Sequence, residues 1–463
     1  EPNETYNVSV GGVAAVGTIN DDDLAPTISS VTSDTKVEGT SLVHTVTLSN
    51  ASSVSTSFAY TIGGGNATSG TDYGTPTFSN GVTLSAGNLI VPAGVTSFTI
   101  TVPSTQDTID EPNETYNVSV GGVAAVGTIT DDDAAPTIAS VSSASATEAS
   151  SIVHTVNLSN GSSVATTYSL SFTDGTATGG GTDYTSNLTN LAFSNGVTIS
   201  GGTITVPAGV TSFTVTVPTT ADVISEANET YTLTVGAASG TGTINDDDAA
   251  PTVSTVTSAT QNEGTALVHT VTMSGVSSST TSYAYTIGGG NATSGTDYGT
   301  PTFSNGVTLS GGNLIVPAGV SSFTITVPST QDTIDEPNET YNVSVGGVAA
   351  VGTIVDDDAA PTISTVTSDA QTEGTSLVHT VTLSNASSVS TSFAYTIGGG
   401  NATSGTDYGT PTFSNGVTLS AGNLIVPAGV TNFTITVPTT QDTIDEPNET
   451  YNVSVGGVAA VGT

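Results

Sequence analysis

The carboxylate side chains of this chain recur at fixed positions, and almost no positive charge opposes them. The chain has 40 Asp and Glu residues but a single basic residue, Lys36, so its formal net charge is −39 at pH 7. All of the acids except Asp34, Asp174 and Asp369 belong to one repeating set. Because carboxylates packed together without a counter-ion repel strongly, the pattern predicts a multivalent cation as their partner.

The repeating set offers only oxygen donors. The chain has no cysteine, and its 4 histidines lie outside the acidic segments. Hard oxygen ligands favour calcium or magnesium over zinc or copper, and clustered carboxylates suit the flexible coordination of calcium. Charge balance suggests roughly three to four calcium ions per complete repeat. The alternative is a solvated acidic surface like that of salt-loving proteins, but such surfaces scatter their charges over strands, whereas here the acids are confined to loops.

The acids follow an internal repeat. The motif Glu-Pro-Asn-Glu-Thr-Tyr begins at residues 1, 111, 336 and 446, and Glu-Ala-Asn-Glu-Thr-Tyr begins at 226. Cutting after each Asp triplet predicts C-terminal strands of a preceding repeat in 1–23, then repeats 24–133, 134–248 (with an insertion), 249–358 and 359–463, the last without its triplet. Residues 1–18 are identical to 446–463, which favours a window from a longer array over strand donation to a neighbouring chain.

Each repeat carries the pattern of short strands. Apolar residues alternate with polar ones in segments such as 42–48 and 98–102, and Gly, Pro and Asn turn signals separate these segments. Seven or eight strands in about 110 residues are typical of an immunoglobulin-like sandwich. We therefore expect an all-β chain of tandem β-sandwich domains. The junctions are short and contain proline, as in residues 134–136, which favours an extended rod.

Three segments of the repeat resemble the Calx-beta domain family. They are Gly-Thr-Asp-Tyr at 70–73, Asp-Thr-Ile-Asp-Glu-Pro-Asn-Glu-Thr-Tyr at 107–116, and the Asp triplet at 131–133. The resemblance spans each repeat and so nearly the whole chain. It implies calcium-binding β-sandwiches of the kind found in sodium–calcium exchangers and large bacterial surface proteins.

The resemblance also implies a ligand set, which includes the neighbouring acids of the repeat. In the partial repeat and the first repeat these residues are Glu1, Glu4, Asp21, Asp22, Asp23, Glu38, Asp72, Asp107, Asp110, Glu111, Glu114, Asp131, Asp132 and Asp133. In the second repeat they are Glu148, Asp183, Asp222, Glu226, Glu229, Asp246, Asp247 and Asp248. In the third they are Glu263, Asp297, Asp332, Asp335, Glu336, Glu339, Asp356, Asp357 and Asp358, and in the fourth Glu373, Asp407, Asp442, Asp445, Glu446 and Glu449.

Two departures from this set have consequences. Ser225 replaces the aspartate of positions 110, 335 and 445, so we expect that position to be secondary for the metal. The fourth repeat lacks its triplet, so we expect its site to bind more weakly. The Asp triplet followed by Ala-Ala-Pro also resembles cadherin junctions, but the Glu-x-x-Glu segment within one repeat favours Calx-beta.

The remaining features argue against catalysis. His44, His154, His269 and His379 recur on the apolar strand face, where a core histidine is the expected interpretation. No nucleophile elbow or phosphate loop is present. The net charge of −39 excludes nucleic acid and anionic membranes as natural partners, and no stretch approaches the ~20 apolar residues of a membrane span.

We therefore expect no enzyme but a calcium-stiffened structural extender. It would be the stalk region of a giant repetitive adhesin or cell-surface filament, extracellular and on a bacterial surface. Its partners would be calcium ions and neighbouring repeats of the same chain, with lateral contacts to other stalks as a further option. The alternative is a calcium-dependent binding module that contacts glycans or neighbouring stalks directly.

Overall fold

Short strands with one apolar face build the whole chain. The computed structural model describes residues 1–463. In strand β5 (Leu42–Leu48), Leu42, His44, Val46 and Leu48 are buried, and the residues between them are exposed or half-buried. This period-two burial is that of a strand that lays one face on a core. The prediction of an all-β fold is confirmed, and the only helical segment is a 3₁₀ turn, Leu188–Asn190, in the second repeat.

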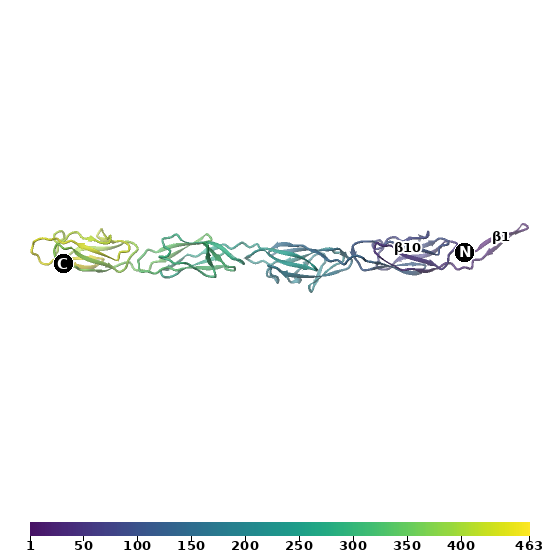
Figure 1. Ribbon diagram of the computed structural model, residues 1–463, viewed down its shortest axis with the longest axis horizontal. Helices are drawn as coiled ribbons and strands as arrows, with labels where there is room; N and C mark the ends of the chain where they lie inside the picture. Colours follow the sequence, from purple (N-terminus) through teal and green to yellow (C-terminus); the bar gives the residue numbers. More distant parts are fainter. The chain divides into compact units, whose positions relative to one another are not determined.

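The chain divides into two compact units, and each holds two β-sandwiches. The first unit is Glu1–Asp222 with Asn228–Asp247, and the second is Val223–Ala227 with Asp248–Thr463. Within each sandwich a four-stranded sheet faces a larger sheet (Figure 1).

The first unit contains the following sheets, in spatial order. The first sandwich has β3 (Ile28–Val31), β5, β10 (Ser97–Val102) and β7 (Thr77–Phe78) in one sheet. Its other sheet has β4 (Asp34–Val37), β13 (Val123–Thr130), β12 (Glu114–Val120), β6 (Thr56–Gly63), β9 (Asn88–Val91) and β8 (Thr83–Ser85). The second sandwich has β14 (Ile138–Val141), β16 (Ser151–Leu158), β22 (Ser212–Pro218) and β19 (Ala192–Phe193), facing β15 (Ala144–Thr147), β25 (Ala238–Asn245), β24 (Glu229–Val235), β18 (Thr166–Asp174), β21 (Thr203–Val206) and β20 (Thr198–Ser200).

The second unit repeats the same topology. Its first sandwich has β26 (Val253–Val256), β28 (Leu267–Met273), β34 (Ser322–Val327) and β31 (Thr302–Phe303), facing β27 (Ala259–Asn262), β36 (Val348–Val355), β35 (Glu339–Val345), β30 (Thr281–Gly288), β33 (Asn313–Val316) and β32 (Thr308–Ser310). Its second sandwich has β37 (Ile363–Val366), β38 (Leu377–Leu383), β43 (Asn432–Val437) and β40 (Thr412–Phe413), facing β41 (Thr418–Ser420), β42 (Asn423–Val426), β39 (Thr391–Gly398), β44 (Tyr451–Val455) and β45 (Val458–Gly462).

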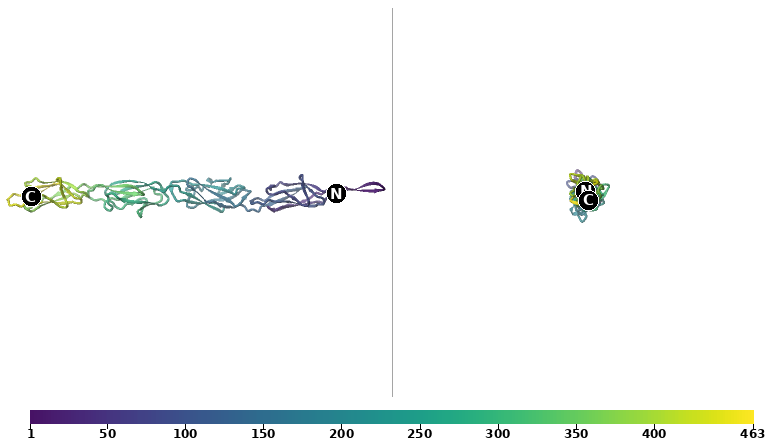
Figure 2. Two further views of the ribbon diagram at one scale, coloured as in Figure 1. Left: turned by 90° about the horizontal axis from the view of Figure 1, so that it is seen from above. Right: turned by 90° about the vertical axis from the view of Figure 1, so that its left-hand side faces the viewer.

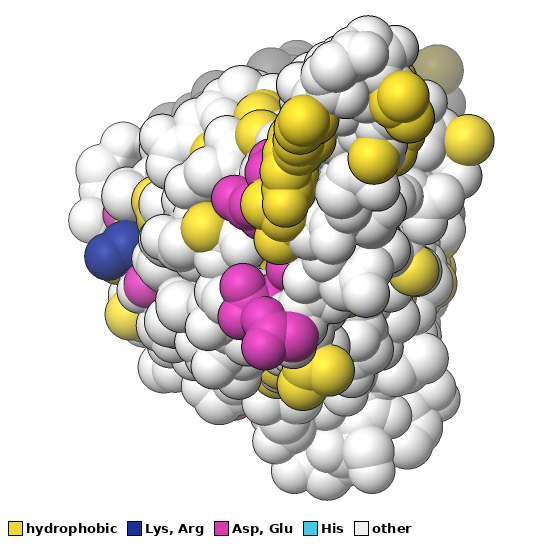
Figure 3. Space-filling model, turned by 90° about the vertical axis from the view of Figure 1, so that its right-hand side faces the viewer, with side chains coloured by type: hydrophobic (Ala, Val, Ile, Leu, Met, Phe, Trp, Pro, Cys, Tyr) yellow, Lys and Arg dark blue, Asp and Glu magenta, His cyan; other side chains and the backbone are white.

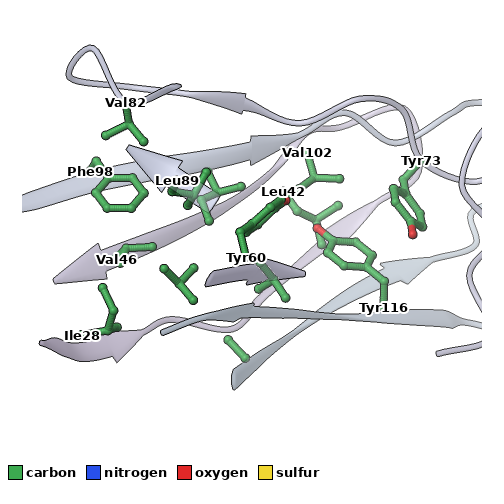
Figure 4. Packing of buried hydrophobic residues seen from close by; sticks show 14 of the residues in the cluster. Ile28, Leu42, Val46, Tyr60, Tyr73, Val82, Leu89, Phe98, Val102 and Tyr116 are labelled. Carbon is green, nitrogen blue, oxygen red and sulfur yellow. The ribbon is translucent and has the colours of Figure 1, made fainter. Parts of the chain in front are cut away.

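Each sandwich encloses its own hydrophobic core between its two sheets. In the first sandwich Leu42, Phe98 and Tyr116 are fully or almost fully buried, and they belong to one cluster of side chains that runs along the core (Figure 4). The other three sandwiches have equivalent clusters. Burial of this apolar surface, at about 25 cal/mol per Å², is the main term that holds each sandwich together.

A buried tyrosine ties the two sheets together at the acidic end of the core. The hydroxyl of Tyr116 on β12 lies 2.9 Å from Nε2 of His44 on β5, and Nδ1 of His44 lies 2.8 Å from the carbonyl of Thr32. The ring of Tyr116 lies against Gly127 on β13, where an added Cβ would be 2.3 Å from Cζ of the tyrosine. The recurring histidine is therefore a hydrogen-bonded core residue, as the sequence predicts.

The N-terminal segment forms a hairpin of its own. Strands β1 (Glu4–Val10) and β2 (Val13–Ile19) pair only with each other (Figure 2). Tyr6, Val10 and Val13 are exposed there, and hydrophobic side chains stand out beside acidic ones on this face (Figure 3). The identical sequence at 446–463 supplies β44 and β45, whose alternate residues are buried in the fourth sandwich. The apolar face of β1 and β2 is thus the face that a sandwich core covers.

Candidate metal centre

The acidic segments of a repeat meet at one end of its sandwich. Strands β4, β10 and β13 end there, and β12 begins there with Glu114. The parallel pairing of β4 with β13 continues into a hydrogen bond from the Glu38 amide to the Thr130 carbonyl, 3.0 Å, which brings Glu38 beside the Asp triplet. The Thr105 amide donates to the Asp72 carbonyl, 2.9 Å, and this contact joins two of the acidic loops.

The first sandwich holds two clusters of carboxylates at this end. Carboxylate oxygens of Glu38, Asp107 and Asp133 lie within 4.8 Å of one another, and those of Asp72, Glu111 and Glu114 do the same. One pocket is lined by six of the predicted acids: Glu38, Asp72, Asp107, Glu111, Glu114 and Asp131. Residues up to 93 positions apart, from four separate segments, therefore share one site.

The third repeat, in the second unit, builds the same site. Carboxylate oxygens of Glu263, Asp357 and Asp358 lie within 4.8 Å of one another. The corresponding pocket is lined by Glu263, Asp297, Asp332, Glu336, Glu339 and Asp356.

The other repeats carry their predicted acids on the same loops. In the second repeat, the acids of the first unit follow or begin strands: Glu148 follows β15, Asp183 follows β18, Asp222 follows β22, Glu229 begins β24, and Asp246 and Asp247 follow β25. The other two acids of this repeat, Glu226 and Asp248, belong to the second unit. In the fourth repeat, Glu373, Asp407, Asp442, Glu446 and Glu449 line one pocket. In the N-terminal segment, the Asp21 amide donates to Oδ1 of Asn3, 2.8 Å, the same contact that Asp131 makes with Asn113. Glu1, Glu4, Asp22 and Asp23 lie at the corresponding positions of this hairpin.

Several oxygen atoms of the site are buried without a hydrogen-bond partner. They include Oδ1 of Asp131, Oδ1 of Asp356 and Oε1 of Glu263, and the Glu263 side chain is only 7% exposed. A buried carboxylate oxygen without a partner is costly, because it has lost its hydration. These atoms point into a site made only of oxygen donors, so the residues fit a hard divalent cation such as calcium.

Burial and mutual repulsion raise the pKa values of the glutamates in the site. Loss of hydration, and then the charges of Asp107, Asp131 and Asp133, raise the pKa of Glu38 to about 7. Loss of hydration and a hydrogen bond with Asp72 raise the pKa of Glu114 to about 7. Loss of hydration and the charges of Asp332 and Asp358 raise the pKa of Glu263 to about 7. Loss of hydration and a hydrogen bond with Asp297 raise the pKa of Glu339 to about 7. The ion-free site therefore holds protons near neutral pH, in competition with a cation.

An amide side chain that sequence reasoning missed also enters the cluster. Nε2 of Gln106 donates to Oε1 of Glu38, 3.0 Å, and to Oδ1 of Asp132, 3.1 Å. Gly39 makes room for it, because a Cβ at that position would lie 2.7 Å from Oε1 of Gln106. The second repeat has Ala149 at the glycine position and Ala221 at the glutamine position. This paired change within the chain is the signal that could have revealed the contact.

The three acids outside the repeating set have structural partners. Oδ2 of Asp34 accepts from the Val43 amide, 2.8 Å, and Oδ2 of Asp369 accepts from the Val378 amide, 2.7 Å. Oδ1 of Asp174 accepts from the Tyr184 hydroxyl, 2.6 Å. These carboxylates therefore fix strands and loops of their sandwiches.

The structure gives Asp110 and Asp335 partners in the following sandwich of the same unit. Oδ2 of Asp110 accepts from the Ser162 hydroxyl, 2.8 Å, and Oδ2 of Asp335 accepts from the Ser387 hydroxyl, 2.7 Å. Their role as metal ligands stays a prediction, as it does for the rest of the predicted set.

Comparison with known proteins gives the family. The Calx-beta domain model matches residues 21–142, 131–259, 245–367 and 356–461. The chain therefore belongs to the Calx-beta domain family, as its motifs indicate, and the cadherin alternative falls away. Calx-beta domains are calcium-binding domains, and this chain has clusters of carboxylates that could hold a metal ion. None of the curated proteins compared with the chain matches it.

The chain is also similar to several solved structures. The crystal structure of CBD12 from CALX1.2 has 17% identity over 45% of this chain and 79% of that chain, with a TM-score of 0.19. The I-band fragment I67–I69 from titin has 10% identity over 73% of this chain and 100% of that chain, with a TM-score of 0.21. The four N-terminal Ig domains of Dscam1 isoform 4.44 have 9% identity over 94% of this chain and 97% of that chain, with a TM-score of 0.16.

Proposed function

We propose that the chain is a calcium-stiffened structural extender, the stalk of a large extracellular adhesin or filament on a bacterial surface. The observation that carries the proposal is the pocket of six acids at the end of the first sandwich, repeated in the third. The Asp triplet of each pocket leads directly into the first strand of the next repeat, as Asp133 leads to β14. A cation held there joins the loops of one sandwich to its exit segment.

The energetics favour such a role where free calcium is high. Extracellular calcium modules bind with dissociation constants of roughly 10⁻⁴ to 10⁻³ M. At one to ten times its dissociation constant, the ratio that about millimolar calcium gives, a cation adds about 0.4–1.4 kcal/mol of stability per independent site. Without disulfides, since the chain has no cysteine, bound ions are the cross-links available to it.

The residues of the chain and their burial favour a spacer over a catalyst or a glycan-binding module. The repeats present the same loops several times, with no serine or histidine arranged for nucleophilic attack, so we propose no enzymatic activity. Glycan sites usually present exposed aromatic platforms, but Tyr60, Tyr73, Phe98 and Tyr116 are buried in the first sandwich. No helical segment is both long and apolar enough to cross a bilayer.

Small-angle X-ray scattering and thermal unfolding of the chain, in 1–5 mM calcium (about the extracellular level) and in chelator, test the proposal. We expect calcium to raise the unfolding temperature and to increase the maximum dimension. If chelation changes neither the unfolding temperature nor the maximum dimension, the chain is a passive scaffold and calcium does not stiffen it. The same preparations, tested on a glycan array, separate the spacer from the direct binding module.

A further inference from the structure

The acidic loop of one sandwich also pairs with the next sandwich of its unit. Strand β11 (Ile109–Asp110) lies in that loop, and it pairs in parallel with β17 (Gly161–Ser162), which lies between β16 and β18. The Ser163 amide donates to the Asp110 carbonyl, 2.9 Å, and the Ser162 hydroxyl lies 2.8 Å from Oδ2 of Asp110. A main-chain bridge and a charge-assisted hydrogen bond thus join the two sandwiches.

The second unit contains the same arrangement between its own two sandwiches. The Asp335 amide donates to the Ala386 carbonyl, 3.1 Å, and the Ser388 amide donates to the Asp335 carbonyl, 2.9 Å. The Ser387 hydroxyl lies 2.7 Å from Oδ2 of Asp335. Ser162 and Ser387 are each only 4% exposed. Two independent copies of one buried contact show that the repeat sequence specifies it.

The serine is held in place by its own sandwich. The Gly209 amide, in a Pro-Ala-Gly turn, donates to the Ser162 carbonyl, 2.8 Å, and the Val164 amide lies 3.3 Å from the Ser162 hydroxyl oxygen. Ser52 in the first sandwich has the same two contacts, from the amides of Gly94 and Val54. Each repeat therefore fixes this serine by contacts within its own fold. We call the serine, with the two amides that contact it, the serine socket.

The loop strand is held in place by the metal centre. Oδ1 of Asp107, a member of the first carboxylate cluster, accepts from the Ile109 amide at the start of β11, 2.7 Å. Asp332 makes the same contact with the Ile334 amide, 2.8 Å. The strand that reaches the next sandwich therefore lies between the candidate ligands Asp107 and Glu111.

We propose that Asp110 and Asp335 are junction clamps: each seats the acidic loop of one Calx-beta repeat in the serine socket of the next. The partner of the socket is thus a Thr-Ile-Asp-Glu-Pro segment of a second repeat. In this proposal Asp110 and Asp335 hold the junction between two repeats together and do not bind the metal. The mechanical consequence of the clamp rests on the proposed stalk function, whereas the clamp itself does not.

The second unit also shows a clamp without the carboxylate. There β23 (Ile224–Ser225) pairs in parallel with β29 (Val276–Ser277), and the Ser278 amide donates to the Ser225 carbonyl, 3.0 Å. The Ser277 hydroxyl lies 3.1 Å from the Ser225 carbonyl. The main-chain pairing is kept and the charged acceptor is lost, so we expect this clamp to open more often than the other two.

Hydrogen exchange of the full chain, in saturating calcium and in chelator, tests the clamp. Asp110→Ala and Ser162→Ala are expected to lower the protection of the Ser163 amide roughly tenfold, the loss of one charge-assisted hydrogen bond. Asp110→Asn keeps an acceptor and is expected to restore part of the protection. Ser52→Ala and Asp445→Ala are the matched controls, since neither residue has a clamp partner in this chain, and they are expected to leave both junctions unchanged.

Calcium binding of the same variants separates the clamp from the metal centre. We expect Asp335→Ala to keep the calcium stoichiometry and affinity of the parent chain. A loss of bound calcium in Asp110→Ala or Asp335→Ala would make these residues ligands and overturn the clamp, as would unchanged protection at Ser163 and Ser388. If the variants open the junctions while chelator does not, the clamp stands and calcium stiffening fails.

Discussion

At the residue scale, the glutamates of the metal centre make the stability of the calcium-free chain depend on pH, and we expect calcium to remove this dependence. Glu38 and Glu114 have a pKa of about 7 in the folded chain, above the ordinary value of 4.5. A carboxyl with a raised folded pKa stabilises the folded state fully below the unfolded pKa. This contribution is lost as the pH rises through the folded pKa.

We therefore expect the unfolding temperature of the calcium-free chain to fall as the pH rises from about 4.5 to 7. Saturating calcium is expected to abolish this fall, because the cation replaces the protons. Calorimetric titration at pH 6.5 in buffers of different ionisation enthalpy should show proton release on calcium binding, and at pH 9 it should show almost none.

Glu38→Gln should raise the calcium-free unfolding temperature and weaken calcium binding. A calcium-free unfolding temperature that rises from pH 5 to 7 would contradict these pKa values.

The contact between Gly39 and Gln106 gives a second prediction at this scale. Gly39→Ala places a Cβ 2.7 Å from Oε1 of Gln106, so the amide must leave Glu38 and Asp132. We expect a loss of about 1–2 kcal/mol in the stability of the calcium-free first sandwich, measured by hydrogen exchange at its core amides. Gly39→Ala with Gln106→Ala should recover part of this loss, since the second repeat combines Ala149 (φ 56°) with Ala221. Equal losses in the single and double variants would show that backbone strain alone is responsible.

The sequence pointed to the acids that line the pocket, whose role as metal ligands stays a prediction, but not to the neutral side chain among them. Glu38, Asp72, Asp107 and Glu114 stand out because they repeat and no cation opposes them. Gln106 recurs at 331 and 441 but is replaced by Ala221 in the second repeat, and an amide carries no charge that demands a partner, so its recurrence alone did not mark it.

At the scale of the elements, the strand pattern predicted the sandwiches because alternation of apolar residues dictates which face is buried. It could not predict β11 and β17, which are two residues each and have no apolar period. Asp110 was grouped with the metal ligands for the same reason: its sequence neighbours are acids, and only the fold brings Ser162, 52 positions away, to its side chain.

The packing of Tyr116 on Gly127 gives a prediction for the larger sheet. Gly127→Ala would place its Cβ 2.3 Å from Cζ of the buried Tyr116 ring. We expect a loss of about 1–3 kcal/mol, because overpacking forces the ring off its hydrogen bond with His44. Gly122→Ala is the matched control for loss of a glycine, with no atom within 4 Å of the added Cβ but with a positive φ of 87°. Hydrogen exchange at β12 measures the difference, and equal protection in Gly127→Ala and the parent chain would contradict this packing.

At the scale of the whole molecule, the single basic residue allows a simple test of calcium protection. Lys36 is the only Lys or Arg of the chain, so trypsin can cut only after it. It lies on β4, paired with Ile129 of β13 and two residues from Glu38. Cleavage requires β4 to detach, so we expect calcium to slow it roughly tenfold or more relative to chelator. Mass spectrometry should find only the fragments 1–36 and 37–463, and calcium-independent cleavage would show that the cation does not hold β4.

The central claim is that the acidic pockets hold calcium, and equilibrium dialysis against calcium at about 1 mM, an extracellular level, tests it most directly. We predict roughly three to four bound ions for each complete repeat, from charge balance over clustered carboxylates. Glu38→Gln with Glu114→Gln should lower the total by the ions of one repeat. A parent chain that binds less than one ion per complete repeat at this concentration would contradict the account.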